Sequence, residues 1–225
     1  MIPVSRADEQ RWSPLFDATV RRRGMVAIDR LLGKAVTAPG RKPREIFQSP
    51  EEIAPDRFPA YWTEVRPVDG RSTLDDMMDA YGQYCAYLAM RIERATGSPT
   101  VDHFVAKERD WRLVYEWSNY RLSAACVNGA KGTRLVIDPF EVQAGWFELN
   151  LDTCFVRRGT SAPAAEHSRI DETLAIINLR QCVDQRREFI SDYRDGEIDL
   201  QNVERYAPFI AMELRRQGQL MRGDV

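Results

Sequence analysis

Helical periodicity is clearest in the middle of the chain, directly after a capping pattern. Ser72 and Thr73 precede Asp75 and Asp76, and a hydroxyl residue followed by acidic residues is typical of the first turn of a helix. The apolar positions that follow are three or four residues apart, as one helix face requires: Leu74, Met77, Met78 and Tyr81. We therefore predict that a helix starts here.

Two extended segments are expected after this helix. Residues 85–92 alternate in part between apolar and other positions, which favours a strand because Gly82 weakens a continued helix. Residues 96–99 then supply a turn, and residues 100–105 form the second strand of the predicted hairpin.

A short strand and a helix are expected next. Residues 119–122 read as extended, and Ser123 can cap a helix that runs through Asn128 towards Lys131. Gly132 is a typical helix stop, because glycine readily adopts the conformation that ends a helix.

The second half of the chain predicts a hairpin followed by helices. Residues 140–149 and 154–158 have the pattern of paired strands, and helical periodicity begins near Ala165. Three helices are indicated, with apolar positions at Ile170, Leu174 and Ile177, at Cys182, Phe189 and Ile190, and at Phe209, Ile210, Met212 and Leu214. The predicted fold class is α+β, with a small β-rich centre between helical flanks.

The N-terminal part is basic and rich in chain-breaking residues. Residues 1–47 carry twice as many Lys and Arg as Asp and Glu residues, with basic runs at 21–23 and 41–44. We interpret it as an arm with little core of its own, and favour a solvated extension over an electrostatic contact with nucleic acid or an acidic partner. The expected organisation is a basic extension, a central core with its following hairpin and a helical region, over residues 1–70, 71–160 and 161–225.

The composition is that of a soluble globular protein. The chain has 225 residues, of which 44% are hydrophobic and 29% charged, a balance that excludes disorder over the whole length. No apolar run reaches the ~18 residues of a membrane span, and the first residues lack an export pattern, so we expect no membrane contact and a cytoplasmic location. The net charge of −2 does not favour a dedicated nucleic-acid coat protein but permits a local basic surface.

Cysteine and histidine are scarce. Histidine chemistry must use His103 or His167, and His167 falls on a predicted helix surface, where we give it no role. No two cysteines form a Cys-x-x-Cys pair, so the sequence contains no direct zinc-knuckle motif. We expect reduced thiols in or near the core: Cys85, Cys126, Cys154 and Cys182.

One acid, one imidazole and two amides lie within 27 residues and suggest a hydrolytic site: Asp102, His103, Asn119 and Asn128. Asp102 and His103 are neighbours, and their side chains can reach one site only if the strand ends there, because adjacent strand residues face opposite ways. Asn128, on the following helix, can give a neutral oxygen to the same hard cation. Phosphodiester hydrolysis needs an activated water and charge stabilisation at phosphate, and an imidazole beside a cation can supply both.

The spacing of these residues resembles the HNH nuclease family, whose fold is the ββα-metal fold. The resemblance lies in Asp102-His103-Phe104-x-x-Lys107, in Asn119, and in Asn128-x-x-Lys131-Gly132. It covers about residues 85–132. The stretches Tyr115-Glu116-Trp117-Ser118-Asn119 and Ile137-Asp138-Pro139-Phe140 look like a bacterial HNH branch often found beside ATPase genes in anti-phage systems.

The resemblance implies a role for each motif residue. His103 would be the general base, and Asp102 and Asn128 would bind one Mg²⁺ or Mn²⁺ ion. Asn119 would orient the histidine, so its role would be more structural than chemical. Lys107 and Lys131 are candidates for phosphate contacts.

The chain departs from many family members at the structural zinc site. Where those proteins have two Cys-x-x-Cys pairs, this chain has Cys85 with Leu88, and Ser123 with Cys126. Four thiolates cannot be assembled from these positions, so a structural Zn²⁺ is not expected.

We therefore expect a metal-dependent HNH endonuclease that acts on DNA, as the nuclease subunit of a defence system. RNA remains open as a target, because the chemistry needs only a phosphodiester. Since the net charge is acidic, a partner protein such as an ATPase, or a homo-oligomer, is expected to deliver the substrate, with residues 165–217 as docking surface. The alternative is a catalytically silent module of the same fold that binds nucleic acid or an ATPase partner.

Overall fold

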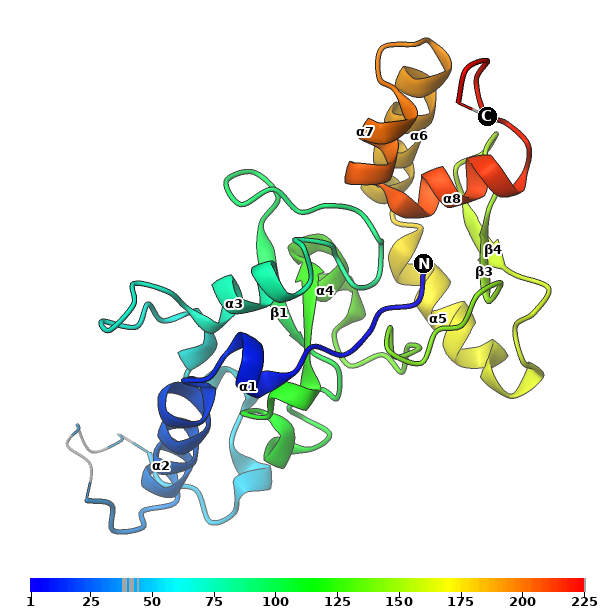
Figure 1. Cartoon of the computed structure of the whole chain (residues 1–225). Helices are drawn as coiled ribbons and strands as arrows, with labels where there is room; N and C mark the ends of the chain where they lie inside the picture. The colour runs from blue at the N-terminus through cyan, green and yellow to red at the C-terminus, as the bar shows by residue number, and fades with distance from the viewer. Residues whose placement is uncertain (38–39, 41–42, 44, 225) are drawn as a thin grey trace. The chain divides into compact units, whose positions relative to one another are not determined.

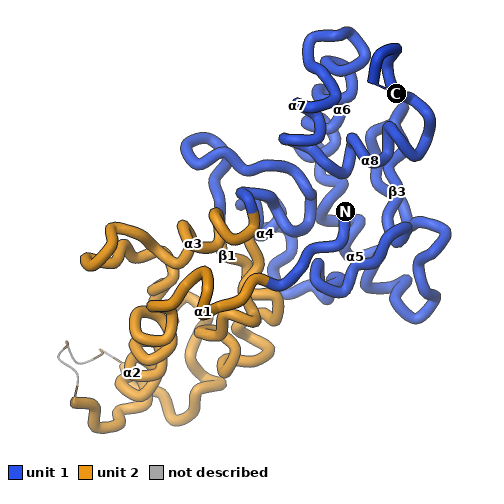
Figure 2. Tube along the Cα trace, viewed as in Figure 1, with its two compact units in different colours: residues 1–6, 82–99, 123–225 blue, residues 7–81, 100–122 orange. Residues whose placement is uncertain are grey.

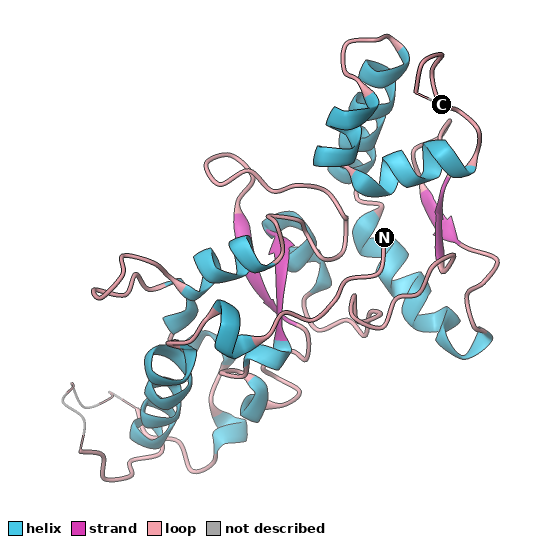
Figure 3. Cartoon of the chain, in the orientation of Figure 1, coloured by secondary structure: helices cyan, strands magenta, loops and turns pink. Residues whose placement is uncertain are grey.

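The computed structural model has a mixed α+β fold and describes residues 1–37, 40, 43 and 45–224. Within these residues it contains eight α-helices and two small two-stranded antiparallel sheets, joined by long loops and short 3₁₀ turns (Figures 1 and 3). The predicted α+β class is thus confirmed, whereas the ββα-metal core stays a prediction. Among the described helices, none combines the length and the apolar character that a membrane crossing would need.

The chain divides into two compact units (Figure 2). Unit 1 comprises residues 1–6, 82–99 and 123–225, and unit 2 comprises residues 7–81 and 100–122. The division crosses the first sheet, whose strands are β1 (Pro99–His103) and β2 (Tyr120–Ala124). It therefore differs from the three consecutive regions expected from the sequence.

Unit 2 begins with α1 (Glu9–Trp12), a π-helical turn at Asp17–Arg21 and α2 (Arg22–Leu31). Its third helix, α3 (Thr73–Ala80), is the one predicted from the capping pattern, and that prediction is confirmed. Ser72 accepts a hydrogen bond from the Asp75 backbone amide, and the Asp75 carboxylate accepts one from the Ser72 amide. This reciprocal pair satisfies two amides that the helix leaves open.

The N-terminal segment contributes more to the core than an arm would. Most of its buried apolar side chains belong to unit 2, among them Phe16, Val20, Ile28, Ile53, Phe58 and Trp62. The basic run at 21–23 is neutralised, because Arg21 pairs with Glu9 and Glu116, Arg22 with Asp17, and Arg23 with Glu64. In the run at 41–44, residues 41, 42 and 44 lie outside the described residues.

A buried carboxylate ties the N-terminal segment to α3. Asp76 accepts hydrogen bonds from Ser13 Oγ at 2.6 Å, from both terminal nitrogens of Arg66 at 2.6 and 3.0 Å, and from Arg71 Nε at 3.1 Å. A buried ion needs such a complete set of partners to offset its lost hydration. Asp76 thus fixes the loop that carries Trp62 against the rest of unit 2.

The predicted hairpin of residues 85–92 with 100–105 is wrong. Residues 85–92 form turns with one isolated bridge between Tyr84 and Arg91, and Ala89 has a φ of +50°. The chain folds back on itself there, because the Cys85 amide donates to the Met90 carbonyl and the Ala89 amide to the Cys85 carbonyl. The strand β1 exists, but its partner is β2.

Unit 1 holds α4 (Ala125–Lys131) and the hairpin of β3 (Phe147–Leu149) with β4 (Val156–Arg158), which confirms the predicted second hairpin with shorter strands. Gly132 ends α4 with a φ of +48°, as predicted. Ser123 does not cap α4, because Ala124 takes the capping position and the Ser123 hydroxyl donates to the Ala124 carbonyl.

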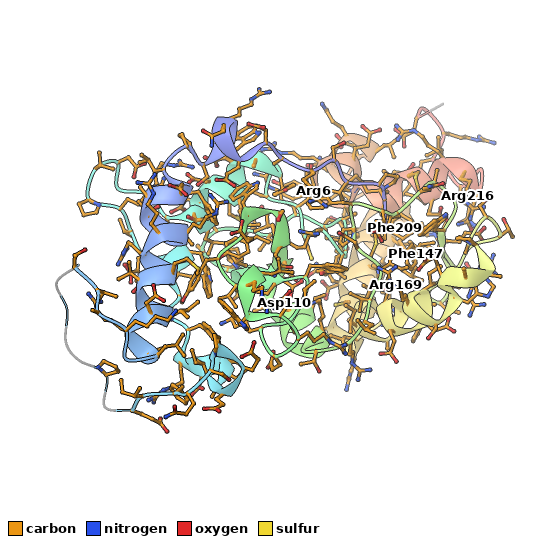
Figure 4. The ribbon with its side chains drawn as sticks, turned by 90° about the horizontal axis from the view of Figure 1, so that it is seen from below. Arg6, Asp110, Phe147, Arg169, Phe209 and Arg216 are labelled. Atoms are coloured by element: carbon orange, nitrogen blue, oxygen red, sulfur yellow. The ribbon has the colours of Figure 1, made fainter. Side chains whose placement is uncertain are left out.

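Four more helices complete unit 1: α5 (His167–Ile177), α6 (Arg180–Arg194), α7 (Leu200–Tyr206) and α8 (Pro208–Arg216). α5 contacts β4 and α8 contacts β3, so the hairpin lies against two helices. Phe147 and Phe209, labelled in Figure 4, are among the buried side chains of this region. The apolar faces expected to dock a partner are thus largely buried within unit 1 itself, although Met212 is exposed and Leu174 is half-buried.

Substitution of two helical glycines would test how closely Tyr115 packs against α2. A Cβ at Gly24, in α2, would lie 2.1 Å from a ring carbon of Tyr115, whereas a Cβ at Gly129, in α4, would meet nothing within 4 Å. Gly24→Ala should therefore destabilise the protein by about 2 kcal/mol, despite the better helix propensity of alanine. The matched control Gly129→Ala should stabilise it by up to about 1 kcal/mol. Chemical denaturation measures both, and equal effects would contradict the packing of Tyr115 on α2.

Candidate functional site

His103 is the last residue of β1 and has a defined hydrogen bond. Its Nε2 lies 2.9 Å from the Val114 carbonyl oxygen. Because a carbonyl only accepts, Nε2 carries the proton in the neutral ring and Nδ1 carries the lone pair. His103 is 9% exposed, and its ring makes edge contacts with both Trp62 and Tyr120, with ring centroids 4.7 and 5.0 Å away.

The Val114 carbonyl holds two side chains. It accepts the His103 hydrogen bond and a second one from the Tyr120 hydroxyl at 2.8 Å. Burial raises the pKa of Tyr120 well above its usual value, so the phenol stays protonated and acts as a donor. This carbonyl therefore fixes the orientation of the imidazole from a backbone position.

Asn119 organises the loop between β1 and β2. Its Oδ1 accepts from the Val105 amide at 2.8 Å, and its Nδ2 donates to the Val105 carbonyl at 3.0 Å and to the Leu113 carbonyl at 3.1 Å. A carboxamide has the same donor and acceptor as a peptide group, so Asn119 extends the pairing beyond the end of β1. Since Leu113 precedes Val114, this amide supports His103 through the loop.

Asp102 precedes His103 on β1 and is 2% exposed. β1 ends at His103, which is the strand-end position that the sequence argument requires. Both side chains belong to unit 2, together with Asn119 and Lys107.

Lys107 lies against the same aromatic ring as His103. Its Nζ is 4.9 Å from the Trp62 ring centroid and 3.4 Å from the Pro55 carbonyl oxygen. Burial lowers the pKa of Lys107, while the carboxylates of Glu108 and Asp56 act in the opposite direction. Its expected phosphate contact stays a prediction.

Asn128 and Lys131 lie on α4, in unit 1. Asn128 is half-buried. Lys131 is 1% exposed, a degree of burial that does not suit the phosphate contact expected for it. Because Asp102 belongs to unit 2 and Asn128 to unit 1, their pairing at one metal ion stays a prediction.

Oxygen donors are the ligand type that Mg²⁺ and Mn²⁺ prefer, and the side chains of Asp102 and Asn128 fit that preference chemically. In the part of the chain that the structure describes, no group of three or more His, Cys, Asp or Glu side chains is arranged to hold a metal ion. A site made of one carboxylate, one carboxamide and waters contains only one side chain of these four types, so it is not one of these groups.

Sequence reasoning missed Val114 and Trp62 as parts of the site. Val114 acts through its backbone carbonyl, which leaves no signal in the residue type. Trp62 lies far from the motif in sequence, and only the fold brings it against His103.

Comparison with known proteins gives no independent assignment. The chain matches no protein-family model and no curated protein. The resemblance to HNH nucleases therefore rests on the motif residues themselves.

Asn119→Ala should destabilise the protein by about 3 kcal/mol, because it removes three hydrogen bonds and leaves backbone groups of the loop unpaired. Asn202→Ala, at an exposed position in α7, should change stability by less than about 0.5 kcal/mol. Denaturant unfolding curves compare the two variants. A small effect of Asn119→Ala would show that the loop keeps its conformation without the amide.

Proposed function

We propose that this protein is a metal-dependent endonuclease of the HNH type that hydrolyses phosphodiester bonds in DNA. The observation that supports this most is the hydrogen bond from His103 Nε2 to the Val114 carbonyl. In the neutral ring, it makes Nδ1 the basic position of a histidine that ends a strand and directly follows Asp102 in the chain.

In the proposed reaction, His103 is the general base. Nδ1 takes a proton from a water molecule as the water oxygen attacks phosphorus, and the bond to the leaving 3′ oxygen breaks. The imidazole gains a positive charge in this step. Its Nε2–H bond to the Val114 carbonyl then becomes charge-assisted and stronger, which stabilises the ring as it accepts the proton.

The surrounding residues keep this base in place. Trp62 and Tyr120 restrict rotation of the ring by edge contacts, and Asn119 fixes the loop that provides the carbonyl. A base held in one orientation reacts without first losing rotational freedom. Asn119 is in this scheme a positioning residue, since its side chain forms hydrogen bonds with the loop backbone.

Asp102 and Asn128 would hold one Mg²⁺ or Mn²⁺ ion through their side-chain oxygens. Such an ion, when bound, neutralises charge at the phosphate and at the leaving oxygen. Few protein ligands suit Mg²⁺, because it retains several waters and binds substrate phosphate directly.

The order of elements supports a ββα-metal core. β1, β2 and α4 follow one another in the chain, and α4 starts directly after β2. The motif positions fall on these elements as the resemblance requires, with Asp102 and His103 on β1 and Asn128 on α4. An ATPase partner or a second copy that delivers DNA is part of the proposal, because the net charge of −2 gives the chain little attraction for DNA.

One observation favours the second candidate, a silent nucleic-acid or ATPase-binding module. His103 is only 9% exposed, and Lys107 is engaged with Trp62 and the Pro55 carbonyl. A substrate phosphate would thus have to approach the exposed edge of the ring. Cleavage assays distinguish the two candidates.

The two histidines of the chain provide a matched pair of variants. His103→Ala should lower cleavage of supercoiled plasmid in Mn²⁺ by about 10²–10⁴-fold, because it removes the general base. His167→Ala removes the other imidazole, which contacts Arg158 in unit 1, and should leave the rate unchanged. Wild-type activity of His103→Ala would exclude the mechanism, and an inactive wild-type protein would favour the silent module. A parallel assay with single-stranded RNA tests the target.

Metal binding can be measured without activity. Titration calorimetry with Mn²⁺ alone should show one site in the wild-type protein and a loss of affinity of at least about tenfold in Asn128→Ala, because few protein ligands hold the ion. Asn202→Ala should bind Mn²⁺ like the wild type. Unchanged binding by Asn128→Ala would remove Asn128 from the ligand set.

A further inference from the structure

Three of the four cysteines meet at one cavity in unit 1. The cavity has a volume of about 370 Å³. Its lining combines three thiols with apolar and aromatic side chains, among them Cys85, Met90, Cys126, Cys182, Phe189 and Tyr206. The thiols come from separate segments: the turn after α3, the first turn of α4 and the first turn of α6. The fourth cysteine, Cys154, is not part of this lining.

Two of these thiols are direct neighbours. Cys126 and Cys182 line the same cavity, and the proximity of Cys126 is one of the causes that raise the pKa of Cys182. Cys85 has different surroundings, because the Ala124 amide donates to its sulfur at 3.5 Å and the Ser123 hydroxyl lies 4.0 Å away. Cys85 is thus held by its local backbone, which leaves Cys126 and Cys182 as the candidate pair at the cavity.

The two neighbours differ in access. Cys126 is exposed, whereas Cys182 is buried. Burial, followed by the nearby Cys126, raises the pKa of Cys182 to about 12, so Cys182 is mostly a neutral thiol at neutral pH. An oxidant arriving from solvent therefore meets Cys126 first.

We propose that Cys126 is an oxidation site for hydrogen peroxide and that Cys182 resolves it by forming a Cys126–Cys182 disulfide. This inference is independent of the proposed nuclease activity. The cavity is large compared with the ~30 Å³ that one water occupies in the liquid, so a small peroxide fits beside the two sulfurs.

The reaction balances in two steps. The Cys126 sulfur attacks one peroxide oxygen, the O–O bond breaks, and the products are Cys126 sulfenic acid and one water. The Cys182 sulfur then attacks the Cys126 sulfur, the S–O bond breaks, and the hydroxyl leaves with the Cys182 proton as a second water. Two thiols are oxidised by two electrons, and one peroxide is reduced to two waters.

The disulfide would join the start of α4 to the start of α6. These helices belong to the same unit, and 55 residues separate the two cysteines in the chain. Closing a loop of this length restricts the unfolded chain, so the oxidised protein should melt at a higher temperature than the reduced one.

The test uses the full-length reduced protein, treated with hydrogen peroxide and digested without reductant. Mass spectrometry should find a peptide pair that joins Cys126 to Cys182. Cys154→Ser removes a cysteine outside the cavity and should still form the link, and Cys85→Ser should do so as well. Cys126→Ser should lose the link. It should fold normally, because position 126 is exposed.

Cys182→Ser adds a second readout. Without the resolving thiol, the sulfenic acid at Cys126 should accumulate and be trapped by dimedone. A Cys85–Cys126 link in the wild type, oxidation of Cys182 in Cys126→Ser, or over-oxidised Cys126 without a disulfide would each overturn the proposal. Stoichiometric zinc in the purified protein that is lost on Cys126→Ser would also overturn it, because the thiols would then be metal ligands.

Discussion

The site in unit 2 depends on how the backbone of one loop is held. β1 ends at His103 and β2 begins at Tyr120, so the loop between them lacks regular strand pairing. The Asn119 carboxamide replaces that pairing at Val105 and also holds the Leu113 carbonyl. The next carbonyl, that of Val114, accepts from both His103 and Tyr120. A single side-chain amide thereby connects the end of a strand to the orientation of an imidazole.

Aromatic packing makes this arrangement rigid. Phe16 lies edge-on to Trp117 and Tyr120, and Trp62 lies edge-on to His103 and Tyr120. Trp62 is held in turn by the segment that Asp76 anchors through Arg66 and Arg71. The N-terminal segment is therefore a structural part of the candidate site. Its basic run serves this packing, since each arginine at 21–23 has a carboxylate partner.

The two units carry different kinds of chemistry. Unit 2 holds the oxygen and nitrogen groups of the candidate site, and the polar side-chain atoms of Asn119 and His103 are hydrogen-bonded to backbone groups. Unit 1 gathers soft sulfur groups at an apolar cavity, where burial disfavours thiolates and raises the pKa values of Cys85 and Cys182. Cys85 and Cys126 both belong to this sulfur cluster. Each of them stands where many HNH proteins have one cysteine of a zinc-binding Cys-x-x-Cys pair. The third thiol, Cys182, comes from α6, far away in sequence.

The sequence alone determined the features that depend on local physics. The Ser72–Asp75 capping pair, the Gly132 stop, the hairpin at 147–158 and the α+β class were all predictable, because caps, turns and periodicity act over a few residues. The fold-back at residues 85–92 was not predictable in this way. Its apolar residues alternate because they are buried in a turn, in which Ala89 has a positive φ. The candidate residues His103 and Asn119 were found from their spacing. Their hydrogen-bond partners were decided only by the tertiary structure: the Val114 carbonyl is a backbone group without a residue-type signal, and Trp62 and Cys182 reach their neighbours through long-range packing.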